Sequence, residues 1–410
     1  MGLLIIHLHI NIQRENRLIG GENMPKRIGL EIGTAKTKIV VGQMVKNDFK
    51  ITGYEVFDTV DGVYSIDEDI DLLRMELPIK EALSRLNIRN GNLYVTINNE
   101  KVIIRTRELP RVSPKEMFGV VRFEAENFLP YDIDAFYIDY KVLEEVAEKK
   151  VGETDQNEVL FNVMIIAAPK EIVNQYIELA DKLKLKLKLA TVYTEAATKF
   201  FSEHFLEENK NNLFVDIGSK FTNMTMYEGF HYFANIKTER GISGMFDRLV
   251  DHHGYNEHDV KYYLYNYTGK ANLRENASDR IELIKASIAS NETEKSLKDL
   301  HKQLETIQNL KGTNDDDSDL LARRNHEYDN LINEINRMVD FFKSRKYGIF
   351  VDTIYLFGGG AYLSNFCEAV EESIGVNCKV LPLTAFTDTL QKEHSELMVP
   401  AIGACLGGLS

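Results

Sequence analysis

The sequence predicts an α/β protein of two lobes, and three stretches carry that prediction. Apolar residues alternate with other residues in Arg27–Ile32, as in a strand, and a small polar turn and a second strand-like run follow. Leu213–Met226 repeats this strand–turn–strand pattern later in the chain. A third strand, Val351–Phe357, runs directly into three glycines and a helical pattern. Two similar turns separated by the length of a lobe predict two related halves.

The composition fits a chain of this size and limits its function. With 410 residues, 44% of them hydrophobic, the chain can bury cores in two or more lobes. A net charge of −14 disfavours general nucleic-acid binding. The three cysteines, Cys367, Cys378 and Cys405, lack metal-site spacing, so we expect buried thiols in a reducing compartment. No apolar run is long enough to span a bilayer.

The first 23 residues look unlike the rest. Their apolar stretch is short, contains two histidines and lacks a basic leader, which disfavours a secretory signal. Gly21–Met24 can be encoded by a ribosome-binding sequence followed by a start codon. We therefore expect Met24 to be the true start and residues 1–23 to lie outside the fold.

The elements of the first half follow in order. A third strand is expected at Ile51–Phe57, a helix at Pro78–Leu86 and two strands at Leu93–Ile97 and Val102–Arg107. The next helix begins at Ser113, since a serine cap, a proline and a glutamate follow the pattern of a capping box. Further strands are predicted from periodicity at Tyr137–Leu143, Val159–Ala168 and Leu185–Val192, with helices at Pro169–Leu183 and from Thr194.

The first turn has chemistry suited to a phosphate. Gly33 offers backbone N–H groups, Thr34 a hydroxyl, Lys38 a cation and Glu31 a carboxylate for a metal ion. The second turn offers Asp216, Gly218, Ser219 and Thr222 in the same order. Glycines 358, 359 and 360 would let backbone approach a flat ligand at a helix start.

Residues 270–347 are longer than such a core needs. Apolar spacing predicts helices over 281–288, 297–310 and 331–342, with an acidic, turn-rich break at Gly312–Asp319. We interpret the segment as a helical hairpin, and favour a solvated decoration over a partner surface.

Taken together, these motifs resemble the actin, Hsp70 and sugar-kinase superfamily, and within it the PilM family of type IV pilus assembly proteins, relatives of FtsA. The likeness covers Ile28–Gly408 apart from the helical insertion. Its more specific part is VIIRTRELP at Val102–Pro110, FEAENFLP at Phe123–Pro130 and AAPK at Ala167–Lys170. The resemblance implies a two-lobed actin-like ATPase fold with an FtsA/PilM-type inserted subdomain.

The resemblance also implies the bounds of the domains. They are a leader, 1–23; a first lobe, 27–76 and 169–211 with a return helix in 385–410; an inserted partner-binding subdomain, 77–168; a second lobe, 212–255 and 348–384; and its helical subdomain, 256–347.

Site roles follow from the resemblance residue by residue. It implies ATP and Mg²⁺ as cofactors, with Glu31 and Asp216 reaching the metal through water and Glu195 as the catalytic acid. The implied nucleotide-binding residues are Gly33, Thr34, Lys38, Asp216, Gly218, Ser219, Thr222, Gly241, Gly244, Glu257, Lys261, Gly358, Gly359 and Gly360.

Some of these residues have plainer explanations. Glu195 at a helix start is favoured by the helix dipole alone, and Glu257 with Lys261 is an ordinary helical ion pair. Most of the superfamily has aspartate where this chain has Glu31, and the extra methylene changes the metal geometry. We therefore expect nucleotide binding with, at most, slow ATP hydrolysis.

Three functions compete. The first is a cytoplasmic ATP-binding scaffold of type IV pilus assembly, peripheral at the inner face of the membrane. It would hold the cytoplasmic N-terminal tail of a PilN-like membrane protein between the inserted subdomain and the first lobe. It could also contact other pilus assembly proteins, including the assembly ATPase, or self-associate. We expect no binding to nucleic acid, and contact with the membrane only through partners.

The second function is an FtsA-like division protein that polymerises. Such chains end in an amphipathic membrane-targeting helix, and the ending Gly407–Ser410 argues against it. The third is a small-molecule kinase of the same superfamily, for which no sugar-kinase signature is present. In the first function, Mg-ATP is expected to bridge the lobes, so that their closure alters the partner groove.

Overall fold

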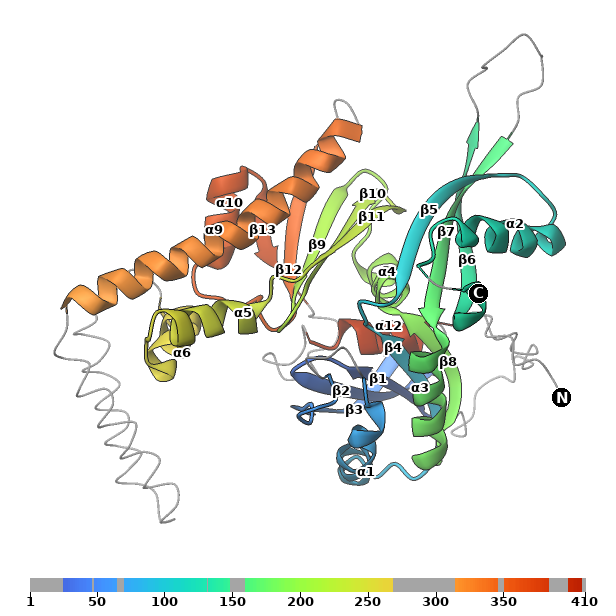
Figure 1. Cartoon of the computed structure of the whole chain (residues 1–410), viewed down its shortest axis with the longest axis horizontal. Coiled ribbons are helices and arrows are strands. Elements are labelled where there is room, and N and C mark those ends of the chain that lie inside the picture. The colour runs from blue at the N-terminus through green and yellow to red at the C-terminus, as the bar shows by residue number, and fades with distance from the viewer. Residues whose placement is uncertain are drawn as a thin grey trace, which may run out of the picture. The chain divides into compact units, whose positions relative to one another are not determined.

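The computed structural model describes residues 25–45, 48–64, 70–130, 132–147, 159–267, 314–345, 350–382 and 397–407 (Figure 1). The chain forms two compact units. The first comprises Met1–Leu213, Thr225–Asn235 and Leu381–Ser410, and the second comprises Phe214–Met224 and Ile236–Val380. The expected leader, the helices over 281–310, the greater part of the insertion and all of 385–396 lie outside the described residues.

The first unit contains a five-stranded sheet in the order β3-β2-β1-β4-β8. The pairs β1–β2 and β2–β3 are antiparallel, whereas β1–β4 and β4–β8 are parallel. The strand bounds are β1 Arg27–Ile32, β2 Lys36–Val45, β3 Asp48–Asp58, β4 Asn92–Ile97 and β8 Lys186–Val192. Each predicted strand of this sheet is therefore present.

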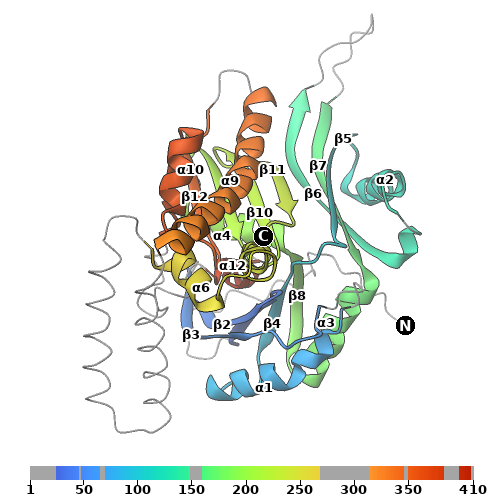
Figure 2. The ribbon, with the colours of Figure 1, turned by 60° about the vertical axis from the view of Figure 1, so that its left-hand side comes forward.

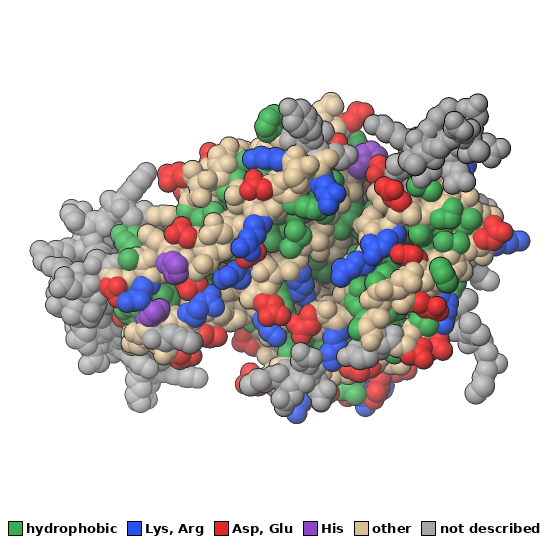
Figure 3. Space-filling model, turned by 45° about the horizontal axis from the view of Figure 1, so that its top comes forward, with side chains coloured by type: hydrophobic (Ala, Val, Ile, Leu, Met, Phe, Trp, Pro, Cys, Tyr) green, Lys and Arg blue, Asp and Glu red, His purple; other side chains and the backbone are tan. Residues whose placement is uncertain are grey.

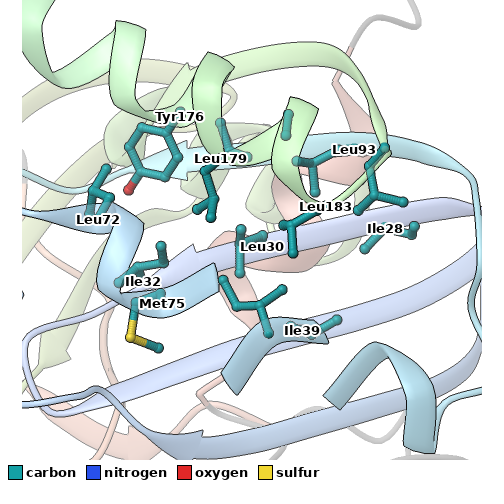
Figure 4. Packing of buried hydrophobic residues seen from close by; sticks show 14 of the residues in the cluster. Ile28, Leu30, Ile32, Ile39, Leu72, Met75, Leu93, Tyr176, Leu179 and Leu183 are labelled. Carbon is teal, nitrogen blue, oxygen red and sulfur yellow. The ribbon is translucent and has the colours of Figure 1, made fainter. Parts of the chain in front are cut away.

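One face of this sheet is packed against helices (Figure 4). Ile28, Leu30 and Ile32 of β1 lie in one buried cluster with Leu179 and Leu183, as the period-2 pattern of β1 requires. These leucines belong to α3 and its C-terminal end, and the helices that contribute to the cluster are η1 Leu72–Met75, α1 Glu76–Arg85 and α3 Lys170–Lys182.

The other face of the sheet is covered by α4 (Tyr193–His204) and α12 (Val399–Leu406), which lie side by side in Figures 1 and 2. The hydroxyl of Thr96 on β4 donates to the carbonyl of Pro400 at 2.8 Å. Arg27 donates to the carbonyl of Cys405. These bonds attach the C-terminal helix to the sheet that begins the fold.

A smaller sheet in the first unit has the order β5-β7-β6, with all pairs antiparallel. Its strands are β5 Ile103–Pro110, β6 Phe136–Ala147 and β7 Val159–Pro169. Helix α2 (Pro114–Glu126) packs on one face, and 3₁₀ turn η2 (Ile133–Ala135) precedes β6. The predicted capping box is confirmed, since the backbone N–H of Ser113 donates to Glu116 Oε2 at 3.1 Å.

The second five-stranded sheet has the order β11-β10-β9-β12-β13. This order repeats that of the first sheet, with three consecutive strands followed by two later ones. The bounds are β9 Asn211–Ile217, β10 Thr222–Glu228, β11 His231–Thr238, β12 Thr353–Phe357 and β13 Asn377–Val380. Two of these strands were not predicted from the sequence: β11, whose side chains are almost all half-buried, and β13, which has four residues.

The helices of the second unit are α5 Ile242–Asp247, the single π-helical turn η3 Arg248–His252, α6 Glu257–Tyr265, α9 Asn314–Arg345 and α10 Phe366–Ile374. The break expected at Gly312–Asp319 is wrong from Asn314 onward, because α9 begins there. Acidic residues in a first helical turn are favoured by the helix dipole, so this acidic run is compatible with a helix start.

The described surface carries charges of both signs (Figure 3), and the thiols of the chain are free. On the face shown in Figure 3, basic and acidic side chains are interspersed. Within the described residues, no helix has the length and apolar character needed to cross a membrane. The three cysteines are free thiols, and two of them, Cys378 and Cys405, are buried as expected.

Candidate functional site

The first turn joins β1 to β2 and is fixed by backbone and hydroxyl bonds. The N–H of Gly33 donates to the carbonyl of Lys36 at 3.1 Å. Thr59, just after β3, donates its hydroxyl to the carbonyl of Gly33 at 2.7 Å and its N–H to the carbonyl of Ala35 at 2.9 Å. Thr34 is half-buried within the turn. Thr59 therefore holds the turn from outside the motif, a role that was not predicted from the sequence.

Glu31 and Lys38 lie opposite each other on β1 and β2. Lys38 Nζ is 3.3 Å from Glu31 Oε2, and the two side chains are only 12% and 4% exposed. No hydrogen bond reaches this carboxylate oxygen in the described part of the chain, although it is buried. A buried acceptor without a directed donor is costly, so the geometry suits an added donor such as a metal-bound water.

The second turn, between β9 and β10, has the same backbone bond as the first. The N–H of Gly218 donates to the carbonyl of Phe221 at 2.9 Å, three residues on, as Gly33 does to Lys36. In both turns the acidic residue stands two positions before the glycine, as Glu31 or Asp216. The repeat predicted from the sequence is therefore present in the backbone.

The glycine turn after β12 lies directly against this second turn. Gly358 has φ +80°, and a Cβ there would be 2.0 Å from Asp216 Oδ1. The N–H of Gly360 donates to the carbonyl of Ile217 at 2.8 Å, whereas Gly359 is exposed. Only glycine fits both the backbone and the space at position 358.

Helix α5 begins beside the same turn. A Cβ on Gly241 would lie 2.2 Å from the carbonyl oxygen of Ser219, so the close approach requires glycine. The N–H and the hydroxyl of Ser243 both donate to that carbonyl, at 2.9 and 2.8 Å. Ser243 is a second supporting residue that was not predicted, because nothing in the sequence relates it to a turn 24 residues earlier.

Thr222 and Gly244 both lie close to other groups of the protein. The side chain of Thr222 is buried, and its hydroxyl donates to the carbonyl of Arg240 at 2.5 Å. A Cβ on Gly244 would lie 3.2 Å from Arg248 Nη1. In this structure the Thr222 hydroxyl is thus engaged in supporting the turn.

Two comparisons bear on the identity of the chain. Residues 29–257 match the family described as type IV pilus assembly protein PilM, and this match spans more than half of the 410 residues. The chain belongs to the PilM family. No curated protein matches it at a significant level.

Solved structures show the fold of this PilM-family chain. A PilM-PilN type IV pilus biogenesis complex matches with a TM-score of 0.67 at 19% identity, covering 94% of this chain and 98% of that one. The fold is thus the α/β, two-lobed fold of actin-like ATPases.

Weaker likenesses are the ethanolamine utilization protein EutJ from Carboxydothermus hydrogenoformans and a ParM hybrid from Bacillus thuringiensis. EutJ has a TM-score of 0.44, 12% identity and coverage of 95% of this chain and 92% of that one. The ParM hybrid has a TM-score of 0.42 and 9% identity, and the match covers 95% of this chain and 50% of that one.

The remaining predicted site residues belong to helices α4 and α6. Glu195 is in the first turn of α4, where both of its carboxylate oxygens accept from Lys141 Nζ at 2.9 Å. Glu257 and Lys261 form a loose pair on α6 at 3.9 Å, with side chains 68% and 64% exposed. Lys141 had no sequence signal, because it lies 54 residues from its partner.

The residues fall into separate sets. Glu31, Gly33, Thr34 and Lys38 share one neighbourhood in the first unit, while Asp216, Gly218, Ser219, Gly241, Gly358 and Gly360 share one in the second. Across the described ranges, no three acidic, histidine or cysteine side chains group as metal ligands.

Proposed function

We propose that this PilM-family protein is an ATP-binding scaffold of the type IV pilus assembly machinery, at the cytoplasmic face of the inner membrane. It holds the cytoplasmic N-terminal tail of a PilN-like membrane protein, and nucleotide changes the strength of that contact. The repeated turn, with Gly33 and Gly218 making the same backbone bond after an acidic residue, is the observation that carries the proposal.

Each turn would supply donors to the phosphates of Mg-ATP. Gly33, Thr34 and Lys38 supply the first set of donors, while Gly218 and Ser219 supply the second. The adenosine would lie against the glycine turn, Gly358–Gly360, with Gly241, Gly244, Glu257 and Lys261 lining the rest of its site. Bound Mg²⁺ would neutralise phosphate charge and hold water molecules that donate to Glu31 and Asp216.

Hydrolysis would be slow at most. The acid expected to order the attacking water, Glu195, is held by Lys141 through two charge-assisted bonds. A carboxylate held in this way has less capacity to accept from a water. The proposed role of ATP is therefore to set the state of the scaffold.

The partner part of the proposal is supported by the family and the neighbour structure. That neighbour is a PilM-PilN complex, and its match covers almost the whole of this chain. The proposed groove lies between the inserted subdomain and the first lobe core. In the structure, α1 and β4 of the predicted range 77–168 belong to that core, and the subdomain is the sheet β5-β7-β6 with α2. A chain of net charge −14 without a membrane-spanning helix in its described part would reach the membrane through such a partner.

Calorimetric titration of the full chain with a synthetic PilN-like N-terminal peptide tests the proposal, with and without Mg-ATP. The tail is expected to bind, with an affinity that nucleotide changes by roughly fivefold or more, since allosteric coupling is typically 1–3 kcal/mol. Asp216→Ala should weaken ATP binding and remove the nucleotide effect. Equal tail affinity in both conditions, with ATP shown to be bound, would contradict the coupling.

A further inference from the structure

The three-stranded sheet of the inserted subdomain has two outer strands. In the order β5-β7-β6, β7 is central, and no other strand of the described chain pairs with β5 or β6. An outer strand offers a row of backbone donors and acceptors to an added strand. The two outer strands differ in how far that row is open.

Three bonds define which backbone groups of β5 point outward. Arg111, just after β5, donates its N–H to the carbonyl of Val159 on β7 at 3.2 Å. Along an antiparallel strand, the backbone N–H and C=O groups of successive residues point to opposite sides. The odd-numbered residues of β5, like Arg111, therefore bond to β7. Consistently, the carbonyls of Ile104 and Thr106 accept from the side chain of the next arginine, at 3.1 and 3.0 Å.

The N–H and C=O groups of Ile104, Thr106 and Glu108 therefore turn away from β7. The pairing of β5 with β7 runs over eight residue pairs in a single register without a bulge. In the described part of the chain, the outward carbonyls of Ile104 and Thr106 accept hydrogen bonds from the side chains of Arg105 and Arg107. This edge is regular and presents alternate donors and acceptors.

The other edge is protected. β6 has a register irregularity between Val142 and Glu144, which interrupts the ladder. The outward N–H of Tyr140 is already taken by Asp139 Oδ1 at 2.8 Å. Bulges and local side-chain bonds are the usual ways to close an edge, so β5 is the edge open to addition.

The two faces beside β5 differ in chemistry. Arg105 and Arg107 lie on the face that carries α2, where Arg105 is exposed and Arg107 is 3.0 Å from Glu124. On the opposite face, half-buried Ile104 packs with the buried side chains of Met164 and Ile166. An added strand would meet cationic side chains on one face. On the other it would meet apolar Ile104, followed by Thr106 and the exposed Glu108.

We propose that β5 binds an extended segment of a partner protein as a fourth strand. The segment has acidic side chains at alternate positions, facing Arg105 and Arg107, and apolar side chains between them, facing Ile104. A chain with a net charge of −14 repels acidic peptides in general, so the local arginines would supply the selection. This proposal deepens the proposed function. It rests on that function in one respect, namely that the ligand is a peptide of a partner protein.

Binding of two synthetic peptides to the full chain tests the inference. One alternates glutamate and valine, and the other alternates lysine and valine. The glutamate peptide is expected to bind and the lysine peptide to bind at least roughly tenfold more weakly, a difference of about 1.4 kcal/mol. Equal binding of the two peptides would overturn the assigned charge preference.

Two substitutions at one position separate the backbone from the side chain. Thr106→Pro removes an outward N–H without removing a ladder bond to β7, and proline is tolerated on edge strands in that orientation. Thr106→Val keeps the N–H and is the matched control. The proline variant should lose roughly tenfold in affinity for the glutamate peptide, since a lost hydrogen bond costs about 1 kcal/mol and an unpaired group costs more.

Hydrogen exchange at single amides gives a readout that does not depend on any variant. On peptide binding, the amides of Ile104, Thr106 and Glu108 should slow in exchange, whereas those of Arg105 and Arg107, already bonded to β7, should change little. Binding without this alternation would overturn strand addition.

The two proposals fail in different ways. A PilN-like tail that binds Thr106→Pro as tightly as the native chain, with its nucleotide effect intact, would overturn the edge and leave the scaffold proposal standing. A glutamate peptide that binds at β5 with the expected alternation, in a protein that binds no nucleotide, would overturn the ATP part of the scaffold proposal alone.

Discussion

Lys141 Nζ lies 2.9 Å from each carboxylate oxygen of Glu195, which connects strand β6 of the inserted subdomain to the first turn of α4. The two side chains are 36% and 21% exposed, so the pair is partly shielded from solvent. Burial raises the pKa of the Tyr227 phenol well above its ordinary value, and the Glu195 carboxylate adds a smaller contribution. The pair therefore links the inserted subdomain to helix α4.

A double-mutant cycle measures this link. Lys141→Met and Glu195→Gln should each destabilise the chain, and the double variant should lose less than the sum of the two. We expect a coupling energy of roughly 1 kcal/mol, because partial exposure screens the pair. Urea unfolding followed by circular dichroism gives the values. A coupling energy near zero would mean that the contact has no energetic role.

Gly358→Ala tests the close approach of the glycine turn to Asp216. The substitution combines a positive φ with a Cβ placed 2.0 Å from Asp216 Oδ1, so the turn must move. We expect ATP affinity to fall by more than about tenfold, the equivalent of 1.4 kcal/mol. Gly119→Ala is the control, since a Cβ there would meet no atom within 4 Å and Gly119 lies outside the proposed nucleotide site. Similar losses of ATP affinity in both variants would contradict a specific role for the close approach.

Lys38→Met removes the cation beside a buried carboxylate. Glu31 would then be a buried charge without a partner, and breaking such a pair typically costs about 3–5 kcal/mol. The double variant Lys38→Met/Glu31→Gln should recover part of that loss. Lys36→Met is the control, because Lys36 pairs with Asp58 at the surface and should change stability by less than about 1 kcal/mol. Thermal melting without nucleotide provides the comparison.

The sequence predicted elements whose signal is local. The alternation of Ile28, Leu30 and Ile32 predicted β1 and its buried face, and a capping box predicted the start of α2. Both follow from residues a few positions apart. The two turns were predicted because each carries its acid and its glycine within a single short segment.

The features that were not predicted depend on distant residues. Thr59, Ser243 and Lys141 each act on a residue at least 24 positions away, and nothing in their own surroundings marks them. The acidic run before Asp319 was mistaken for a break, because the same residues suit both a turn and a helix start. The open edge of β5 could not be predicted from the sequence. Recognising it requires the strand order and register of the sheet, which the sequence of a single strand does not contain.

Two tyrosines of the first lobe core, half-buried Tyr64 and buried Tyr176, give the chain a defined response to high pH. Burial, with a smaller contribution from Glu31, raises the pKa of Tyr64 well above its ordinary value, and burial likewise raises the pKa of Tyr176. Because the pKa is higher in the folded chain than in the unfolded one, the neutral phenol favours folding at every pH below the unfolded value. This stability is lost as the pH rises above about 10, at roughly 1.4 kcal/mol per pH unit for each tyrosine.

Tyr64→Phe isolates one of these groups. The native hydroxyl donates to the carbonyl of Ile32 at 2.6 Å, so the variant should be less stable by about 1 kcal/mol at neutral pH. That difference should shrink above about pH 10, since the native chain alone then loses the contribution of Tyr64. Denaturant unfolding at several pH values, with tyrosinate absorbance recorded in parallel, tests this. A difference that stays constant to high pH would show that Tyr64 ionises without opposing the fold.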